Sequence, residues 1–156
     1  MENEKPYGMG VFIDIYPYDG LGTTEKEAVT YGMKGDRLSS LCYQSTREHF
    51  AIETTTSLFR KIIKYPIFIG SKLIGKDYFQ KKLNQLVELK EYEDSNYIGC
   101  IVWLSGGKKE IFLRKWFDET IMVPFEKYQF RVPKDYDEVL RHTYGDYMQL
   151  PPEKDR

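Results

Sequence analysis

GVFIDIYPYDG, from Gly10 to Gly20, is the stretch of this sequence that most strongly indicates a fold element. A short run of β-forming residues fills its first half and predicts a strand, which Pro17 and Gly20 end. Asp14 interrupts this run, and burying an unpaired carboxylate is costly. Asp14 therefore either has a charged, hydrogen-bonding or metal partner, or lies at the strand end beside a turn. Asp19-Gly20 is typical of a turn, so Asp19 is interpreted as structural.

The composition suits one packed domain over residues 1–156. A chain of 156 residues buries a core without disulfides or metals, and 41% hydrophobic and 15% aromatic residues are unlike a disordered chain. The formal net charge of −1 argues against general nucleic-acid binding. The two cysteines and two histidines are far apart in the sequence, so we expect neither a disulfide framework nor a zinc site.

The ends and the interior of the sequence carry no targeting or membrane signal. The N-terminal MENEKP is acidic and lacks the apolar region of a secretory signal. No run approaches the roughly 18 apolar residues of a membrane span. We therefore expect a soluble, cytoplasmic protein.

Helical periodicity dominates the first half of the chain. Thr23-Thr24, followed at once by acidic residues, predicts a helix start. Apolar or small residues then recur at helical spacing as far as Ser45, and Gly32 and Gly35 leave open whether this is one helix or two.

Two further helices are expected before residue 90. The first contains Leu58, Phe59, Ile62 and Ile63 and is predicted to end at Tyr65-Pro66, because the residue before proline disfavours helix. The second has an apolar stripe that is typical of core packing, formed by Phe79, Leu83, Leu86 and Val87.

The second half reads as strands and one short helix. Residues 91–96 predict a loop, and the apolar run Tyr97–Leu104 predicts a strand covered on both faces. Alternating residues in 120–132 predict a hairpin that turns at 126–127. A short helix should run from Asp135 to Thr143, with Gly145 ending it. The turn SGGKK at 105–109 either wraps a phosphate or only reverses the chain.

Three stretches together resemble the LicD family of phosphocholine and phosphosugar transferases. They are the opening GVFIDIYPYDG, the middle SGGKKEIFLRKWFDETIMVPFEKYQFRVPKDYDEVL and the ending YGDYMQLPPEKDR, in that order. The ending is the most specific, and the helical middle carries little signature. The resemblance implies an α+β fold with a small mixed β-sheet flanked by several helices, an incomplete version of the nucleotidyltransferase fold.

The resemblance also implies a function. Family members are thought to move phosphocholine, or a related phosphoalcohol, from a CDP-linked donor such as CDP-choline to a surface glycan, lipopolysaccharide or teichoic acid. Divalent metal, Mg²⁺ or Mn²⁺, is expected to neutralise the phosphates. Asp14 matches a strand carboxylate of the family, which favours a catalytic role in metal binding. Lys109, Glu110 and Arg114 are candidate substrate contacts, although charges beside an apolar strand are usually solvated.

Tyr144, Asp146 and Tyr147 are the remaining candidates from the resemblance. Aromatic faces attract quaternary ammonium, so these residues either line a sugar or choline site or hold the C-terminal tail against the body. Both interpretations stay open on the sequence.

The sequence departs from the family at its aspartates. Family members carry a D-D-D-x-D cluster before the position of the opening stretch, so this chain is interpreted as the C-terminal portion of the family domain. Alone it is expected to bind metal poorly and to transfer little. The alternatives are a non-catalytic glycan- or nucleotide-binding module, and a protein-interaction module that pairs as a homodimer or with a partner chain.

Overall fold

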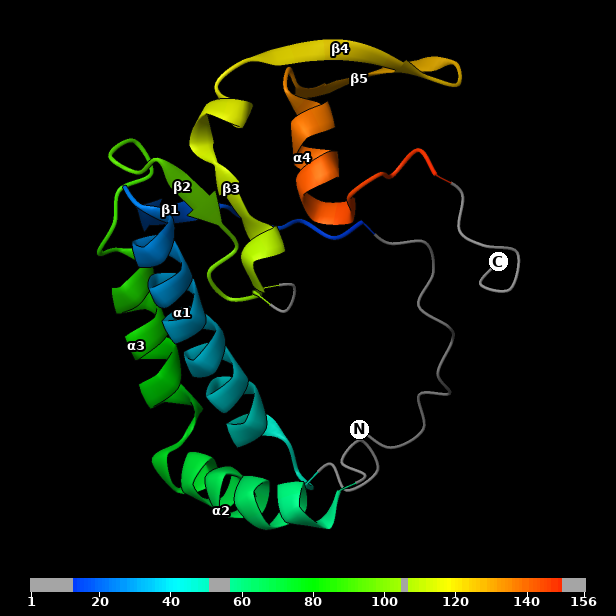
Figure 1. Ribbon diagram of the computed structural model, residues 1–156. Coiled ribbons are helices and arrows are strands. Elements are labelled where there is room, and N and C mark those ends of the chain that lie inside the picture. Colours follow the sequence, from blue (N-terminus) through cyan, green and yellow to red (C-terminus); the bar gives the residue numbers. More distant parts are fainter. Residues whose placement is uncertain (1–12, 51–56, 105–106, 150–156) are drawn as a thin grey trace.

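The computed structural model describes residues 13–50, 57–104 and 107–149. In that part of the chain a bundle of helices packs beside a small sheet, and a hairpin and a last helix lie beyond the sheet (Figure 1). The helices are α1 (Glu25–Thr46), α2 (Leu58–Ile74), α3 (Lys76–Val87) and α4 (Tyr136–Tyr144). The strands are β1 (Asp19–Gly22), β2 (Tyr97–Gly99), β3 (Ile111–Leu113), β4 (Thr120–Phe125) and β5 (Tyr128–Pro133). Two 3₁₀ turns, η1 (Gly107–Glu110) and η2 (Arg114–Phe117), flank β3. The expected α+β class is confirmed.

The described strands pair in two antiparallel sheets rather than in one mixed sheet. The first has the order β1-β2-β3 and the second is the β4-β5 hairpin. The hairpin is confirmed in its predicted register, because Phe125 pairs with Tyr128 across a turn of Glu126 and Lys127. Glu126 has a positive φ of 53°, a conformation that Gly or Asn would adopt more easily.

The opening strand lies further along the chain than predicted. Residues 13–18 form no strand, and Ile13 and Ile15 are 89% and 88% exposed. Residues 11–12 lie outside the described part. The strand β1 instead includes Asp19 and Gly20, where a turn was predicted, and its Leu21 is fully buried in the core. The predicted position of the strand and the predicted turn at Asp19-Gly20 were both wrong, because the strand forms where β2 is available to pair with it.

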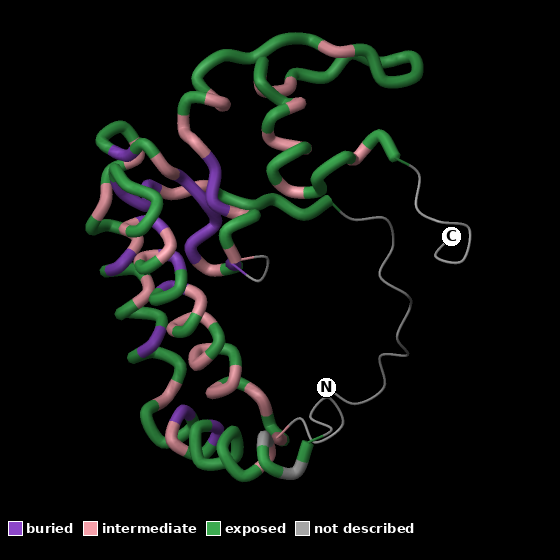
Figure 2. The backbone as a smooth tube through the Cα atoms, viewed as in Figure 1, coloured by how far each residue is buried: buried purple, intermediate pink, exposed green. Residues whose placement is uncertain are grey.

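The core lies between α1, α3 and the three-stranded sheet, where Figure 2 shows the buried segments. Its buried members are Leu21, Ala28, Leu86, Ile101, Leu104 and Ile111. The stripe predicted for residues 79–87 is confirmed, since Phe79 and Leu86 are buried on α3. The cysteines Cys42 and Cys100 are free thiols.

The helix α1 is one continuous helix of 22 residues. Gly32 and Gly35 are both buried within it, where it meets the turn that follows β2. A Cβ at Gly35 would lie 2.4 Å from the Ile101 carbonyl oxygen, and one at Gly32 would lie 2.7 Å from a Leu104 methyl. The glycines thus allow a close approach and do not interrupt the helix.

The helix α2 passes through Pro66 and does not end before it. Proline removes one backbone hydrogen bond from a helix, that to the carbonyl of the residue four positions earlier, here Ile62. Both Pro66 and Ile62 are exposed, so water can hydrate that carbonyl, and the predicted end at Tyr65-Pro66 is wrong. Among the described residues, no helix has the length and apolar character needed to cross a membrane.

The apolar run at residues 97–104 is largely buried, as predicted, but Trp103 within it is 56% exposed. The run is a strand only as far as Gly99. Ile101 and Leu104 turn away from the sheet and pack against the glycines of α1. The loop predicted at residues 91–96 is confirmed. The last helix, α4, ends at Gly145, which has a φ of 73°, as expected of a helix-ending glycine.

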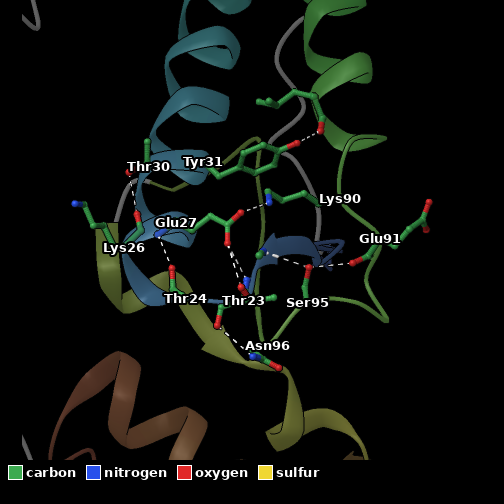
Figure 3. A network of polar contacts seen from close by, with 12 residues as sticks. Thr23, Thr24, Lys26, Glu27, Thr30, Tyr31, Lys90, Glu91, Ser95 and Asn96 are labelled. Carbon is green, nitrogen blue, oxygen red and sulfur yellow. Dashed lines mark hydrogen bonds and ion pairs between the residues drawn. The ribbon is translucent and has the colours of Figure 1, made fainter.

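A polar network joins the start of α1 to the loop after α3 (Figure 3). Thr24 caps α1 by accepting a hydrogen bond from the Glu27 N–H at 3.3 Å, as the sequence predicted. The Glu27 carboxylate accepts from the Thr23 N–H at 3.0 Å and forms an ion pair with Lys90. The Ser95 hydroxyl accepts from the Gly22 N–H at 3.2 Å. This network holds β1 and the loop at residues 91–96 in place.

The network predicts a pH dependence of stability. The hydrogen bond from Lys90, and then that from the Thr23 N–H, hold the pKa of the Glu27 carboxyl below its ordinary value of 4.5. A carboxyl with a lowered folded-state pKa stabilises the fold above its unfolded pKa and loses that contribution as the pH falls through the folded pKa. We expect Glu27→Gln to lower the free energy of unfolding at neutral pH and the difference from wild type to shrink below pH 4.5.

Urea unfolding followed by circular dichroism over this pH range measures the effect. Glu88→Gln, at an exposed position at the end of α3, is the matched control for loss of a surface carboxylate. A pH-independent difference for Glu27→Gln would contradict the prediction.

Candidate functional site

A pocket of about 360 Å³ lies between the segment before β1, the turn after β2, the strand β3 and the helix α4. Its volume falls in the range of small-molecule sites. Half of the residues that line it are aromatic, namely Tyr16, Tyr18, Trp103, Phe112 and Tyr144. Segments that are far apart in the sequence therefore form one aromatic site.

The inner wall of the pocket is held by ring packing. Phe112 is buried in β3, where it pairs with Ile98 of β2. The Tyr18 ring stacks on Phe112 at 5.3 Å between centroids, and the Phe117 ring meets Tyr18 edge-on at 5.4 Å. These contacts hold the Tyr18 ring against the strand β3, which keeps the back of the pocket in a defined shape.

The outer wall is more accessible. Tyr16 is 52% exposed, Trp103 is 56% exposed and Tyr144 is 70% exposed. These rings come from the coil before β1, from the turn after β2 and from the end of α4. A ligand that enters would cover aromatic faces that now contact water.

One carboxylate lines this aromatic pocket. Glu110, the last residue of η1, has a buried Oε2 atom with no hydrogen-bond partner among the described residues. A buried acceptor without a partner costs free energy, and the cost is larger for a charged group. A cation or a hydrogen-bond donor in the pocket would offset that cost.

The electrostatics of the pocket disfavour added negative charge. Burial, followed by the nearby Cys100, Glu110 and Tyr144, raises the pKa of the Tyr18 hydroxyl above its ordinary value. Burial is also the largest cause of the raised pKa of the Cys100 thiol. Both groups therefore stay neutral, because burial disfavours their charged forms.

The structure distributes the predicted site residues over several places. Glu110 and Tyr144 meet in the pocket. Lys109 is exposed on η1. Arg114 instead fixes the loop before β2, because its Nε donates to the Ser95 carbonyl at 2.8 Å and its Nη1 to Asp118 at 3.1 Å.

The two C-terminal tyrosines differ in position: one lines the pocket and the other holds the C-terminal tail against the body. Tyr144 lines the pocket, whereas the Tyr147 hydroxyl donates to the Asp137 carboxylate at 2.6 Å. That hydrogen bond, and then the one from Arg141, lower the pKa of Asp137. Asp146 is exposed between them. Tyr147 thus holds the tail against α4, while Tyr144 is available to a ligand.

Asp14 is exposed in the segment before β1, two positions before Tyr16. Within the described ranges no group of three or more His, Cys, Asp or Glu side chains is placed to hold a metal ion. A divalent metal that bridges phosphates needs several oxygen ligands. The described residues therefore do not fit a metal site, and Asp14 would need further carboxylates to form one.

The turn SGGKK lies only partly within the described residues. Residues 105–106 are outside them, and Gly107 begins η1. Lys108 forms an ion pair with Glu25 at 2.8 Å, which neutralises one of the two lysines considered for phosphate. The phosphate interpretation of this turn stays a prediction.

Several pocket residues were not anticipated from the sequence, namely Tyr16, Tyr18, Cys100, Trp103 and Phe112. Tyr16 and Tyr18 lie within the opening stretch, where the carboxylate is the more distinctive feature. The available signal was the aromatic content of 15%, with 13 tyrosines. Composition does not show which aromatic residues lie close together in space, so the pocket could be identified only from the tertiary structure.

Comparison with known proteins gives the family. No protein-family model matches the chain, and no solved structure matches it significantly. A curated protein, the lipopolysaccharide cholinephosphotransferase LicD of Haemophilus influenzae, is 32% identical over 148 residues. The alignment covers 94% of this chain and 53% of that protein, so the chain spans about half the length of the curated relative that it matches. This match and the three stretches described above agree: the chain belongs to the LicD family.

Proposed function

We propose that the aromatic pocket binds the quaternary ammonium of a phosphocholine group. On this proposal the protein transfers phosphocholine, or a related phosphoalcohol, from a CDP-linked donor to a cell-surface glycan. The relative is named as a lipopolysaccharide cholinephosphotransferase, which supports choline phosphate as the group and lipopolysaccharide as the acceptor.

The observation that carries the proposal is the combination of aromatic faces and one buried, unpartnered carboxylate oxygen. Quaternary ammonium has no N–H to donate, so proteins bind it with ring faces and a nearby negative charge. Tyr18, Trp103 and Tyr144 offer the rings, and Glu110 offers the charge. Burial is the main cause of the raised pKa of Tyr18, so its hydroxyl stays neutral beside a bound ligand.

In this role the chain binds and orients the choline end of the group. The Tyr18 ring, fixed by Phe112, forms the floor against which the methyl groups pack. Divalent metal would supply charge neutralisation at the phosphates. Since the described residues bring together no carboxylate cluster, no step of the proposal is assigned to a metal.

Calorimetric titration with choline and with its neutral isostere 3,3-dimethylbutan-1-ol tests the proposal. The two ligands have the same shape, so a difference in affinity reports charge. We expect choline to bind more tightly, and Glu110→Gln to weaken choline binding by about tenfold while leaving the isostere unchanged. Equal affinity for the two ligands, or no binding of choline, would contradict the proposed choline site. Glu88→Gln is the control for loss of a surface carboxylate.

The second candidate is a non-catalytic module that binds glycan or nucleotide, and the lack of a metal-ligand cluster among the described residues favours it. Titration with CDP-choline, with and without Mg²⁺ or Mn²⁺, separates the two. Metal-dependent binding that Asp14→Ala abolishes would support the transferase. Binding that is indifferent to metal, without turnover, would support the module.

A further inference from the structure

The helix α2 turns its apolar side to solvent. Phe59 is 71% exposed, Ile62 is 64% exposed and Leu73 is 83% exposed. The residues that α2 buries against the rest of the protein include Phe68 and Ser71. Figure 2 shows α2 mostly exposed, and in Figure 1 it lies at the end of the helical part farthest from the strands.

The exposed apolar residues form a continuous surface. Positions 62, 66, 69 and 73 follow the spacing i, i+4, i+7, i+11, which places them in one row along a helix. Positions 59, 63, 67 and 74 lie beside that row. Together they cover roughly half of the helix circumference, at about 100° per residue. An apolar side of this width normally faces a core, and here it faces outward.

The charge of this segment indicates the occupant. Between Ser57 and Lys76 the sequence has five basic residues and no acidic one, in a chain with a net charge of −1. The basic residues are Arg60, Lys61, Lys64, Lys72 and Lys76. A wide apolar side combined with lysine and arginine is typical of helices that lie in the interface of an anionic membrane.

A second copy of the chain fits this surface less well. Two copies that met through α2 would bring two clusters of basic charge together, and like charges in contact repel. Anionic lipid headgroups would pair with the same charges. The 17 residues of α2 extend about 25 Å, and their charges are spread along the helix, so it would lie flat on a bilayer.

We propose that α2 docks this protein on an anionic lipid surface. The residues Phe59, Ile62 and Leu73 insert at the boundary between headgroups and acyl chains, and the exposed Lys64 and Lys76 extend toward the lipid phosphates. This inference does not depend on the aromatic pocket or on the transfer reaction. It assigns to α2 a role as a membrane-surface helix.

Flotation of the full chain with vesicles tests the inference. We expect binding to vesicles of phosphatidylglycerol and phosphatidylcholine, little binding to phosphatidylcholine alone, and release by high salt. Leu73→Glu should weaken binding by about tenfold or more, because a leucine that inserts into the lipid is replaced by a charge. Leu89→Glu is the matched control, since Leu89 is 69% exposed but lies beyond α3, and it should bind as wild type does.

Three outcomes would overturn the proposal. The first is that wild-type protein does not float with the anionic vesicles, and the second is that Leu89→Glu reduces binding as much as Leu73→Glu. The third is a concentration-dependent dimer that Leu73→Glu abolishes while vesicle binding is absent, which would identify a second copy as the occupant. Circular dichroism checks that Leu73→Glu is folded, and Ile62→Ser, a milder change on the same side, replaces it if it is not.

Discussion

Gly35→Ala is expected to lower the free energy of unfolding by about 3 kcal/mol, near the upper end of the usual cost of overpacking. The added methyl would lie 2.4 Å from the Ile101 carbonyl oxygen and 2.6 Å from an Ile101 side-chain carbon. The carbonyl is backbone, and Ile101 is fully buried in the core, so neither atom can move aside cheaply. The gain in helix propensity from alanine, about 1 kcal/mol, does not offset this clash.

Gly70→Ala is the matched control, because Gly70 is also inside a helix but an added methyl there would meet no atom within 4 Å beyond its chain neighbours and the nearby helix backbone. It should raise the free energy of unfolding by about 0.5–1 kcal/mol through helix propensity alone. Urea unfolding of both variants gives the comparison. Equal stability of Gly35→Ala and wild type would show that α1 and the turn after β2 are not in close contact.

Trp103→Ala is expected to reduce choline affinity by about 30-fold, which corresponds to roughly 2 kcal/mol for a desolvated cation–aromatic contact. Trp103 lines the pocket and is 56% exposed, so its removal takes away a ring face without opening a cavity in the core. Calorimetric titration with choline measures the change. The thermal stability of the variant should stay close to that of the wild type.

Tyr43→Ala is the control for loss of an exposed ring, since Tyr43 is 63% exposed on α1 and does not line the pocket. It should leave choline affinity unchanged. If Trp103→Ala also leaves affinity unchanged while Glu110→Gln weakens it, the carboxylate alone carries recognition. If both variants bind as wild type does, choline does not occupy this pocket.

The predictions that succeeded rest on signals confined to a few neighbouring residues. Each of these signals involves residues close together in the sequence. They are the Thr24 cap, the apolar stripe of α3 and the alternation in the β4-β5 hairpin. The failures at Tyr65-Pro66 and at the opening strand involve the same kind of signal. The helix α2 continues through Pro66 because that position is exposed to solvent. The opening strand forms at Asp19–Gly22 because β2 is available to pair there.

The candidate site was only partly accessible from the sequence. Glu110 and Tyr144 were selected through the family resemblance, and the structure places both in the pocket. Asp14 was selected for the same reason, yet it is exposed, and the described residues provide no cluster of ligands around it. Arg114 was chosen for its charge, but its contacts are with the loop before β2.

Local sequence patterns determined most helix positions and the turn of the hairpin, while the family resemblance implied the α+β class. Helix periods, caps and strand alternation depend on residues close together in the chain, so they are readable without a fold. The tertiary structure alone decided that Tyr18, Trp103 and Glu110 share one pocket, and that the apolar side of α2 faces solvent. Both depend on which distant segments meet, since burial is set by contacts between elements and not by the residues of one element.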